Sequence, residues 1–343
     1  MSAHKHGGTD SGMEKFYKDR IVLITGGLGF LGSNLALRLD RLGAKVTLVD
    51  AFLPGHGANW RNIEEIRGRV QVNICDIRDE HAMARMVADK QTIFHIAGQT
   101  SHTDSMTDPF LDIDINCRGN MVFLETVRKH NPEARIVYAS TRAIYGAPVT
   151  VPVTEAVRPN ATDIYGVNKY AGEAYHMIYH RAHGIPVTAL RFSNGYGPRA
   201  QIEHPKFGIL NWFVGLILRN RKIKIFGDGA QLRDYTFADD FIEAFLLAGM
   251  KQDALGQVFN IGATTQIRFL DMVKTLIEIA GQGEYELVPW PPEYKKIEVG
   301  DFAYDISKAQ TVLGWSPSTA FEDGLRKTFD FYRENLKHYL PEG

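Results

Sequence analysis

Short apolar runs alternate with amphipathic stretches along the first part of the chain, and this alternation constrains the fold most. The runs are rich in Val and Ile and end at polar residues or glycine turns, as buried parallel strands do. They are Ile21–Thr25, Lys45–Asp50, Val70–Cys75, Thr92–Ile96, Arg135–Ser140, Val187–Arg191 and Gln257–Ile261. Helical patterns separate them at Leu31–Leu42, Glu80–Val87, Asn116–Lys129 and Tyr165–His183. The order predicts an α/β fold with a Rossmann-type doubly wound parallel sheet.

Charge, cysteine content and hydropathy exclude several classes of protein. The formal net charge of −1 supplies no basic field for nucleic acid or an anionic membrane. The longest apolar stretch, Phe207–Leu218, is shorter than the roughly 20 residues that span a bilayer. Cys75 and Cys117 lack paired spacing, so we expect no disulfide framework, no metal site and a cytoplasmic location.

A glycine-rich turn follows the first expected strand and opens the first helix. Glycines at 26, 29 and 32 allow a tight turn, close approach to a pyrophosphate and tight packing of helix on strand. Phe30 and Leu31 lie inside this turn, where the helix offers unpaired N–H groups to phosphates. Asp50 closes the next strand and can accept both adenosine ribose hydroxyls. The unit predicts a dinucleotide site that prefers NAD to NADP.

Two further strand ends are candidates for contact with the same cofactor. Asp76-Ile77 follows the third strand and suits the adenine edge. Ala97-Gly98-Gln99 follows the fourth strand and is expected to pass close to the cofactor.

A tyrosine and a lysine one helical turn apart suggest the catalytic chemistry. Tyr165 and Lys169 share a helix face, and Thr141 ends the strand that lies beside them in a parallel sheet. Positive charge from Lys169 and from an oxidised nicotinamide would lower the phenol pKa toward that of a general base. The same spacing recurs at Tyr304–Lys308, which is interpreted as packing because it lies far downstream.

Together these residues resemble the extended short-chain dehydrogenase/reductase family, specifically its nucleotide-sugar epimerases and dehydratases. The resemblance runs from Asp19 to Tyr339, and its motifs follow the family's order. They are Thr25–Gly32, Asp50, Asp76-Ile77, Thr141 with Tyr145-Gly146, Tyr165 with Lys169, Arg191–Asn194, Gly227–Gly229, Arg233–Tyr235 and Leu313–Pro317.

The resemblance implies roles for the matched positions. Thr141 would hydrogen-bond the reacting sugar hydroxyl, Tyr165 would take its proton, and Lys169 would bind the nicotinamide ribose. Asn194 and Arg233 would contact the nucleotide diphosphate, for which the planar guanidinium is suited.

The residue after the threonine bears on the reaction. The family's 4,6-dehydratases carry an acid pair there, whereas this chain has Arg142-Ala143. We therefore expect an NAD-dependent epimerase, a 4-epimerase of a nucleotide-linked hexose or uronate, acting through a transient ketosugar. Arg142 could pair with a uronate carboxylate, or point to solvent or a neighbouring acid. A dehydratase or ketosugar reductase of the same family stays open, as does a non-catalytic NAD sensor.

Three parts are expected along the chain. Residues 1–19 are predicted to be a flexible tail. Residues 20–193 with 236–263 would form the NAD-binding Rossmann domain, and 194–235 with 264–340 a smaller nucleotide-sugar-binding lobe. The resemblance also implies a homodimer built on the helices Asn116–Lys129 and Tyr165–His183, and a place in polysaccharide biosynthesis.

Overall fold

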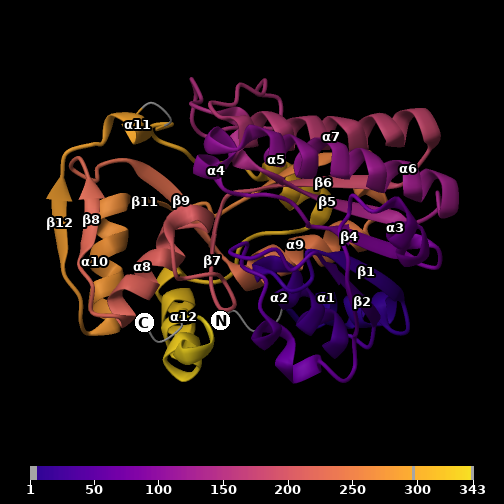
Figure 1. Cartoon of the computed structure of the whole chain (residues 1–343), viewed down its shortest axis with the longest axis horizontal. Coiled ribbons are helices and arrows are strands. Elements are labelled where there is room, and N and C mark those ends of the chain that lie inside the picture. Colours follow the sequence, from indigo (N-terminus) through magenta and orange to yellow (C-terminus); the bar gives the residue numbers. More distant parts are fainter. Residues whose placement is uncertain (1–5, 296–297, 341–343) are drawn as a thin grey trace.

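The computed structural model describes residues 6–295 and 298–340, and its largest feature is a central parallel sheet (Figure 1). Seven strands run in the order β3-β2-β1-β4-β5-β6-β10, and every neighbouring pair is parallel. Their bounds are β1 Ile21–Thr25, β2 Lys45–Asp50, β3 Gln71–Ile74, β4 Thr92–His95, β5 Arg135–Thr141, β6 Val187–Phe192 and β10 Val258–Ile261. The predicted doubly wound sheet is confirmed.

Helices cover both faces of this sheet (Figure 1). One face carries α3 (Glu80–Val87), α6 (Asn120–His130) and α7 (Ile164–His183), and the other carries α1 (His6–Tyr17), α2 (Phe30–Arg41) and α9 (Ala238–Met250). A separate apolar core lies between the sheet and the helices on each face. Strands buried on both sides explain the continuous Val and Ile runs of the sequence.

Helix α1 corrects the expectation of a flexible tail over residues 1–19, of which 1–5 lie outside the described residues. Met13 and Tyr17 are buried, and the Tyr17 hydroxyl donates to the Leu246 carbonyl oxygen of α9 at 2.7 Å. These two side chains and Phe16 recur at helical spacing. Tertiary packing therefore overrides the low helix propensity of the glycines in this segment.

The connection between β4 and α6 is more structured than expected. It contains α4 (His102–Thr107), α5 (Pro109–Ile113) and a wide helical turn, η2 (Asp114–Gly119), so α6 begins four residues later than predicted at Asn120. Ser101 and Asp108 cap the two short helices by accepting the backbone N–H groups of Asp104 and Leu111.

A smaller lobe with its own core lies beside the sheet (Figure 1). Its helices are α8 (Ile209–Leu218), α10 (Phe269–Ala280), α11 (Pro292–Lys295) and α12 (Phe321–Asn335). Its strands are β7 (Asn194–Tyr196), β8 (Ile223–Phe226), β9 (Leu232–Phe237), β11 (Gln266–Arg268) and β12 (Tyr285–Val288). They form the sheets β11-β9-β7 and β12-β8. The exact domain boundaries of the sequence analysis stay a prediction.

Short helices of three to seven residues connect the remaining elements. They are η1 (Trp60–Ile66), η3 (Arg142–Tyr145), η4 (Pro205–Phe207), η5 (Gln252–Ala254), η6 (Ala309–Leu313) and η7 (Leu336–His338). Within residues 6–295 and 298–340, no helix is both long and apolar enough to cross a bilayer.

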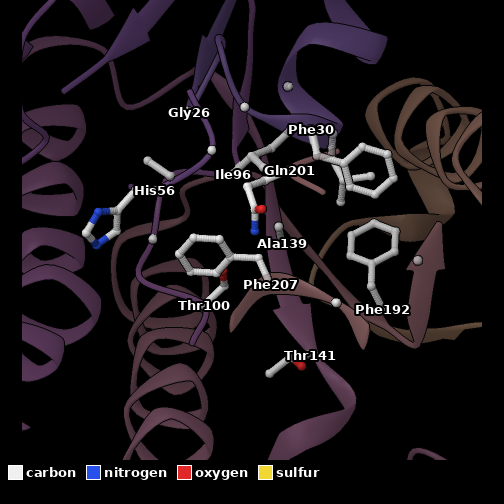
Figure 2. Close-up of a pocket in the computed structure, with 18 of the residues that line it drawn as sticks. Gly26, Phe30, His56, Ile96, Thr100, Ala139, Thr141, Phe192, Gln201 and Phe207 are labelled. Carbon is white, nitrogen blue, oxygen red and sulfur yellow. The ribbon is translucent and has the colours of Figure 1, made fainter. Parts of the chain in front are cut away.

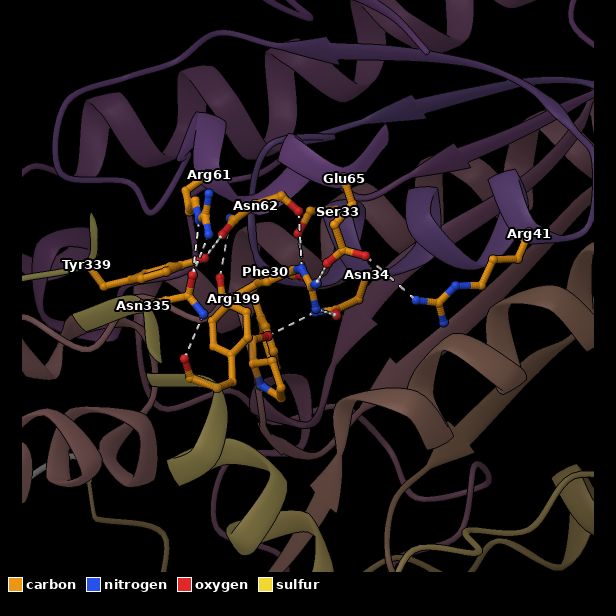
Figure 3. A network of polar contacts seen from close by, with 12 residues as sticks. Phe30, Ser33, Asn34, Arg41, Arg61, Asn62, Glu65, Arg199, Asn335 and Tyr339 are labelled. Atoms are coloured by element: carbon orange, nitrogen blue, oxygen red, sulfur yellow. Dashed lines mark hydrogen bonds and ion pairs between the residues drawn. The ribbon is translucent and has the colours of Figure 1, made fainter. Parts of the chain in front are cut away.

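A polar network centred on Arg199 joins the lobe to the first helices (Figure 3). The guanidinium donates to the Asn62 carbonyl, the Asn34 side-chain oxygen and Glu65, at 3.1, 3.2 and 2.8 Å. It also lies 5.0 Å from the Phe331 ring of α12. One side chain thus fixes the loop after β7 against α2, η1 and α12.

Candidate active site

A cavity of about 500 Å³ lies where the carboxyl ends of the central strands face the lobe, the edge where parallel sheets bind ligands. The glycine turn, Asp50 and the end of β5 form one wall. Gln201 and Phe207, from the loop before α8, line the opposite side and project toward its middle (Figure 2).

The glycine turn has the shape of a phosphate cradle. Gly26 has a φ of +71°, and a Cβ there would lie 3.0 Å from the Ala97 backbone nitrogen. A Cβ on Gly32 would collide with the Gly26 carbonyl oxygen. A Cβ on Gly29 would meet nothing nearer than that oxygen at 3.4 Å. Gly29 lines the cavity with Phe30 and Leu31 at the start of α2, so its open side lets a ligand approach the backbone.

Asp50 lines the cavity at the end of β2. Its two carboxylate oxygens accept the backbone N–H groups of Leu28 and Phe52 at 3.0 and 2.9 Å. Burial raises its pKa, and these two bonds oppose that rise. The carboxylate therefore shapes the glycine turn, and its remaining lone pairs are still suited to hydroxyl donors.

The other strand ends differ in how they meet the cavity. Asp76, Ile77, Ala97 and Gly98 line it, and the Asp76 carboxylate is paired with Arg78 at 2.7 Å. Gln99, predicted to lie along the cofactor, is not among the residues that line the cavity. Its side chain is buried and donates to the backbone carbonyl of Ser101. The Gln99 side chain and the Ser101 backbone thus form a short local turn after β4, which the position of Gln99 at a strand end does not predict.

Thr141, Tyr165 and Lys169 meet at one wall of the cavity. Thr141 ends β5, and Tyr165 and Lys169 lie in the first turns of α7, which Asp163 caps by accepting the Gly166 N–H at 2.7 Å. Thr141 lies close enough to Tyr165 to lower the pKa of its phenol. The structure thus brings together the three residues that the sequence pattern suggested.

The electrostatics of Tyr165 differ from expectation. Burial raises its pKa to about 12, and Asp163 and Asp112 also raise it, whereas Thr141 and the charge of Arg142 lower it. We expected Lys169 to be the lowering cation, but its ammonium donates to the Ala139 carbonyl at 2.6 Å. In the protein alone, Tyr165 is a protonated phenol at neutral pH.

Lys169 is itself buried, and burial lowers its pKa to about 8. The carboxylates of Asp112 and Glu173 oppose that fall. Its ammonium also lies 4.5 Å from the centre of the Tyr138 ring. The group therefore titrates near neutral pH, where small changes in its surroundings change its charge.

The expected substrate residues lie next to each other but are engaged within the protein. Arg142 donates from Nε to the Asn194 side-chain oxygen at 3.1 Å, and Asn194 donates to the Asp234 carbonyl at 3.0 Å. Both line the large cavity. Arg233 lines a second cavity of about 250 Å³ instead, where its guanidinium is paired with Glu298.

Sequence reasoning missed His102 on α4 and its partner Asp163. The Nδ1 atom of His102 lies 2.5 Å from an Asp163 carboxylate oxygen, and its ring meets the Tyr165 ring edge-on, with centroids 4.9 Å apart. Asp163 carried a detectable signal, since it occupies the cap position before the helix. His102 carried none, because α4 is too short for periodicity.

Comparisons with known proteins agree with this geometry. The family model described as GDP-mannose 4,6 dehydratase matches residues 23–328. A putative UDP-glucose 4-epimerase of Methanocaldococcus jannaschii is 31% identical over 92% of this chain and 99% of its own.

Two solved structures are similar over the whole fold. The UDP-glucose 4-epimerase of Thermotoga maritima, solved with UDP-glucose, has a TM-score of 0.83 at 33% identity and covers 92% of this chain and 99% of its own. That of Thermus thermophilus, solved with NAD, has a TM-score of 0.81 at 28% identity and covers 91% and 99%. On this evidence the chain belongs to the extended short-chain dehydrogenase/reductase family of nucleotide-sugar epimerases and dehydratases.

Proposed function

We propose that the protein is an NAD-dependent nucleotide-sugar epimerase, a 4-epimerase of a nucleotide-linked hexose or uronate that acts through a transient ketosugar. One observation carries the proposal: Thr141, Tyr165 and Lys169 line the same cavity as the glycine turn. The epimerases similar to this chain support the reaction class.

NAD fits the residues that line the cavity. Gly29 offers open backbone beside the start of α2 for the pyrophosphate, and Asp50 offers carboxylate oxygens for the adenosine ribose. Asp76, Ile77, Ala97 and Gly98 would lie along the rest of the cofactor. When bound, NAD supplies reversible hydride transfer and a positive charge near the reacting carbon.

The chain's own residues manage the proton. Thr141 orients the sugar hydroxyl, and Tyr165 accepts the proton of that hydroxyl as the alcohol becomes a ketone, then returns it. Because Tyr165 has a pKa of about 12 in the protein alone, its activation requires added positive charge or a lost carboxylate contact. Lys169, whose pKa is lowered to about 8, would orient the nicotinamide ribose.

The nucleotide diphosphate is assigned to Asn194 and Arg233, as the family resemblance implies. Arg233 would exchange its Glu298 contact for phosphate oxygens, which a guanidinium can bind in bidentate geometry. Arg142 lines both cavities beside these residues and would contact the sugar. A uronate carboxylate is one group it could receive.

The residue after Thr141 favours epimerisation over the dehydratase alternative. Elimination of water needs a general acid, and Arg142 and Ala143 stand where the family's dehydratases carry their acid pair. Epimerisation through a ketone needs no additional acid there. A ketosugar reductase remains a second candidate, distinguished by release of the oxidised cofactor during turnover.

A panel of nucleotide sugars in deuterated water, without added cofactor, tests the proposal by NMR. An inverted centre without loss of water from the sugar supports it. A keto-deoxy product would instead establish the dehydratase, and no change with any sugar would contradict both.

We further propose that the enzyme works as a cytoplasmic homodimer in polysaccharide biosynthesis. The helices α5 and α7 expose large apolar side chains, which include Phe110, Val167 and Ile178. A second copy of this chain is the occupant that we assign to this face, so that α6 and α7 would pair with their symmetry equivalents.

A further inference from the structure

An imidazole paired with a buried carboxylate lies beside the proposed base and has no part in the mechanism above. His102 Nδ1 and Asp163 Oδ2 are 2.5 Å apart. The Asp163 side chain is 4% exposed, whereas that of His102 is 42% exposed. Burial alone would raise the Asp163 pKa, but the bond and charge of His102 bring it below its ordinary value. The carboxylate thus stays ionised next to the imidazole.

The position of His102 points to the sugar. It lines both cavities, as does Arg142, so it stands where the cofactor space meets the space next to Arg233. Its ring meets Tyr165 edge-on at 4.9 Å between centroids. A sugar hydroxyl bonded to Tyr165 therefore places the neighbouring carbons of the same ring within reach of His102.

The surrounding contacts fix the orientation of this imidazole. Asp163 is held by its cap bond to Gly166, and Ser105, one turn after His102, accepts the Tyr165 backbone N–H at 3.1 Å. With Nδ1 bonded to Asp163, Nε2 lies on the opposite side of the ring as the atom available to a ligand. A carboxylate that orients an imidazole and leaves one nitrogen to act is the arrangement of a general acid–base pair.

We propose that His102, oriented by Asp163, is a second acid–base catalytic residue that exchanges a proton with a carbon adjacent to the transient ketone. The proposal rests on the proposed function, because an ordinary sugar carbon is not acidic until its neighbour is oxidised. The C–H bond breaks, its proton goes to Nε2, and its electron pair forms the C=C bond of an enolate. The enolate oxygen is stabilised by the Tyr165 and Thr141 hydroxyls. Return of a proton restores the ketone, so there is no net redox change.

The substrate class follows from this chemistry. It is a nucleotide sugar that carries a hydrogen on the carbon next to the oxidised one, and this hydrogen becomes exchangeable with solvent. The protein would therefore label, or invert, a second centre besides the one that hydride transfer inverts.

The test compares the holoenzyme with its H102N and D104N variants in deuterated water, using UDP-glucose, UDP-galactose, UDP-glucuronate and dTDP-glucose as probes. H102N keeps an N–H donor for Asp163 but lacks a basic nitrogen. D104N removes the 3.0 Å ion pair between α4 and Lys206 without touching the imidazole. NMR follows deuterium in the sugar, and absorbance follows reduction of the bound nicotinamide.

We expect the wild type and D104N to place deuterium on a carbon adjacent to the oxidised one. In H102N this incorporation should fall by about 10²-fold or more, while nicotinamide reduction changes only a few-fold. Reduction without deuterium in the wild type would overturn this proposal alone, as would unchanged incorporation in H102N. An equal loss of both signals in H102N would show a positioning residue instead. Absence of nicotinamide reduction with every sugar would overturn the proposed function, and this proposal with it.

Discussion

Tyr165 and Tyr304 each precede a lysine by four residues, but their surroundings differ. Tyr165 lies on the wall of the cavity that Thr141 also lines. Tyr304 is buried in the core, and its hydroxyl is one of the buried polar atoms that lack a partner within residues 6–295 and 298–340. The sequence motif alone could not separate the two, but the position of Tyr165 at the start of a helix that follows the strand ending at Thr141 could.

Replacing each tyrosine by phenylalanine should give opposite results. Tyr165→Phe removes the proposed base, so turnover measured by NMR should fall by about 10²- to 10⁴-fold. Tyr304→Phe removes an unsatisfied buried hydroxyl, so turnover should be unchanged and stability equal or slightly higher. Thermal unfolding checks that both variants fold. Equal turnover in the two variants would contradict the assignment of Tyr165.

Lys169 should make folding stability depend on pH. Its pKa is lowered from 10.5 to about 8 by burial, so between these values the unfolded chain holds a proton that the folded chain has lost. Stability must then rise with pH across this range. The free energy of unfolding should rise by about 3 kcal/mol over this range, at ~1.4 kcal/mol per pKa unit.

Urea unfolding of the wild type and of Lys169→Met, compared from pH 8 to pH 10.5, measures this contribution. The free energy of unfolding of the wild type should rise with pH relative to that of the variant. All other titrating groups are the same in both proteins, so their effects cancel in this difference. A constant difference would show that the ammonium is charged and compensated in the folded protein.

Helices whose ends are encoded locally were predicted with the right bounds. For α3, Asp79 accepts the Ala82 N–H as a cap, and α7 ends at His183 before Gly184 in the left-handed conformation. The sequence did not predict helix α1, because this helix is stabilised by the packing of its apolar face against α9. Helix α4, which contains His102, was not predicted because six residues are too few to show a helical periodicity. Pairs such as Arg233 with Glu298 depend on distant segments that no local pattern reveals.

The loop before α8 should depend on Arg199, the centre of the network in Figure 3. Its side chain is mostly buried and donates to the part-buried oxygens of Asn62 and Asn34 as well as to the exposed Glu65, so Arg199→Met leaves the first two acceptors unpaired. Stability should fall by about 2 kcal/mol or more, and the bound cofactor should dissociate faster because this loop lines the cavity.

Arg41→Met is the matched control. Arg41 pairs with the same glutamate at 4.0 Å, but both side chains are well exposed, so the loss should be at most about 1 kcal/mol. Urea unfolding and cofactor retention on a desalting column measure the two effects. Similar small losses in both variants would mean that the loop is held by other contacts.

At the scale of the whole molecule, α5 and α7 carry the exposed apolar side chains that we assign to the proposed homodimer interface. Phe110 is 80% exposed, Val167 52% and Ile178 46%, and α5 packs against α7 (Figure 1). Tyr179 of the same helix is internal: its side chain is buried and its hydroxyl donates to Glu125.

Charges placed on this face should separate the two subunits. A stable homodimer buries about 1,600 Å² with an apolar centre, so the double variant Phe110→Asp, Ile178→Asp should sediment as a monomer at concentrations where the wild type is a dimer. Leu287→Asp is the control, since Leu287 is 53% exposed but lies on β12 in the smaller lobe. Its variant should remain dimeric. A monomeric wild type, or dissociation by both variants alike, would refute this interface. Because α7 also carries Tyr165 and Lys169, the monomer should further show reduced turnover if the second subunit steadies this helix.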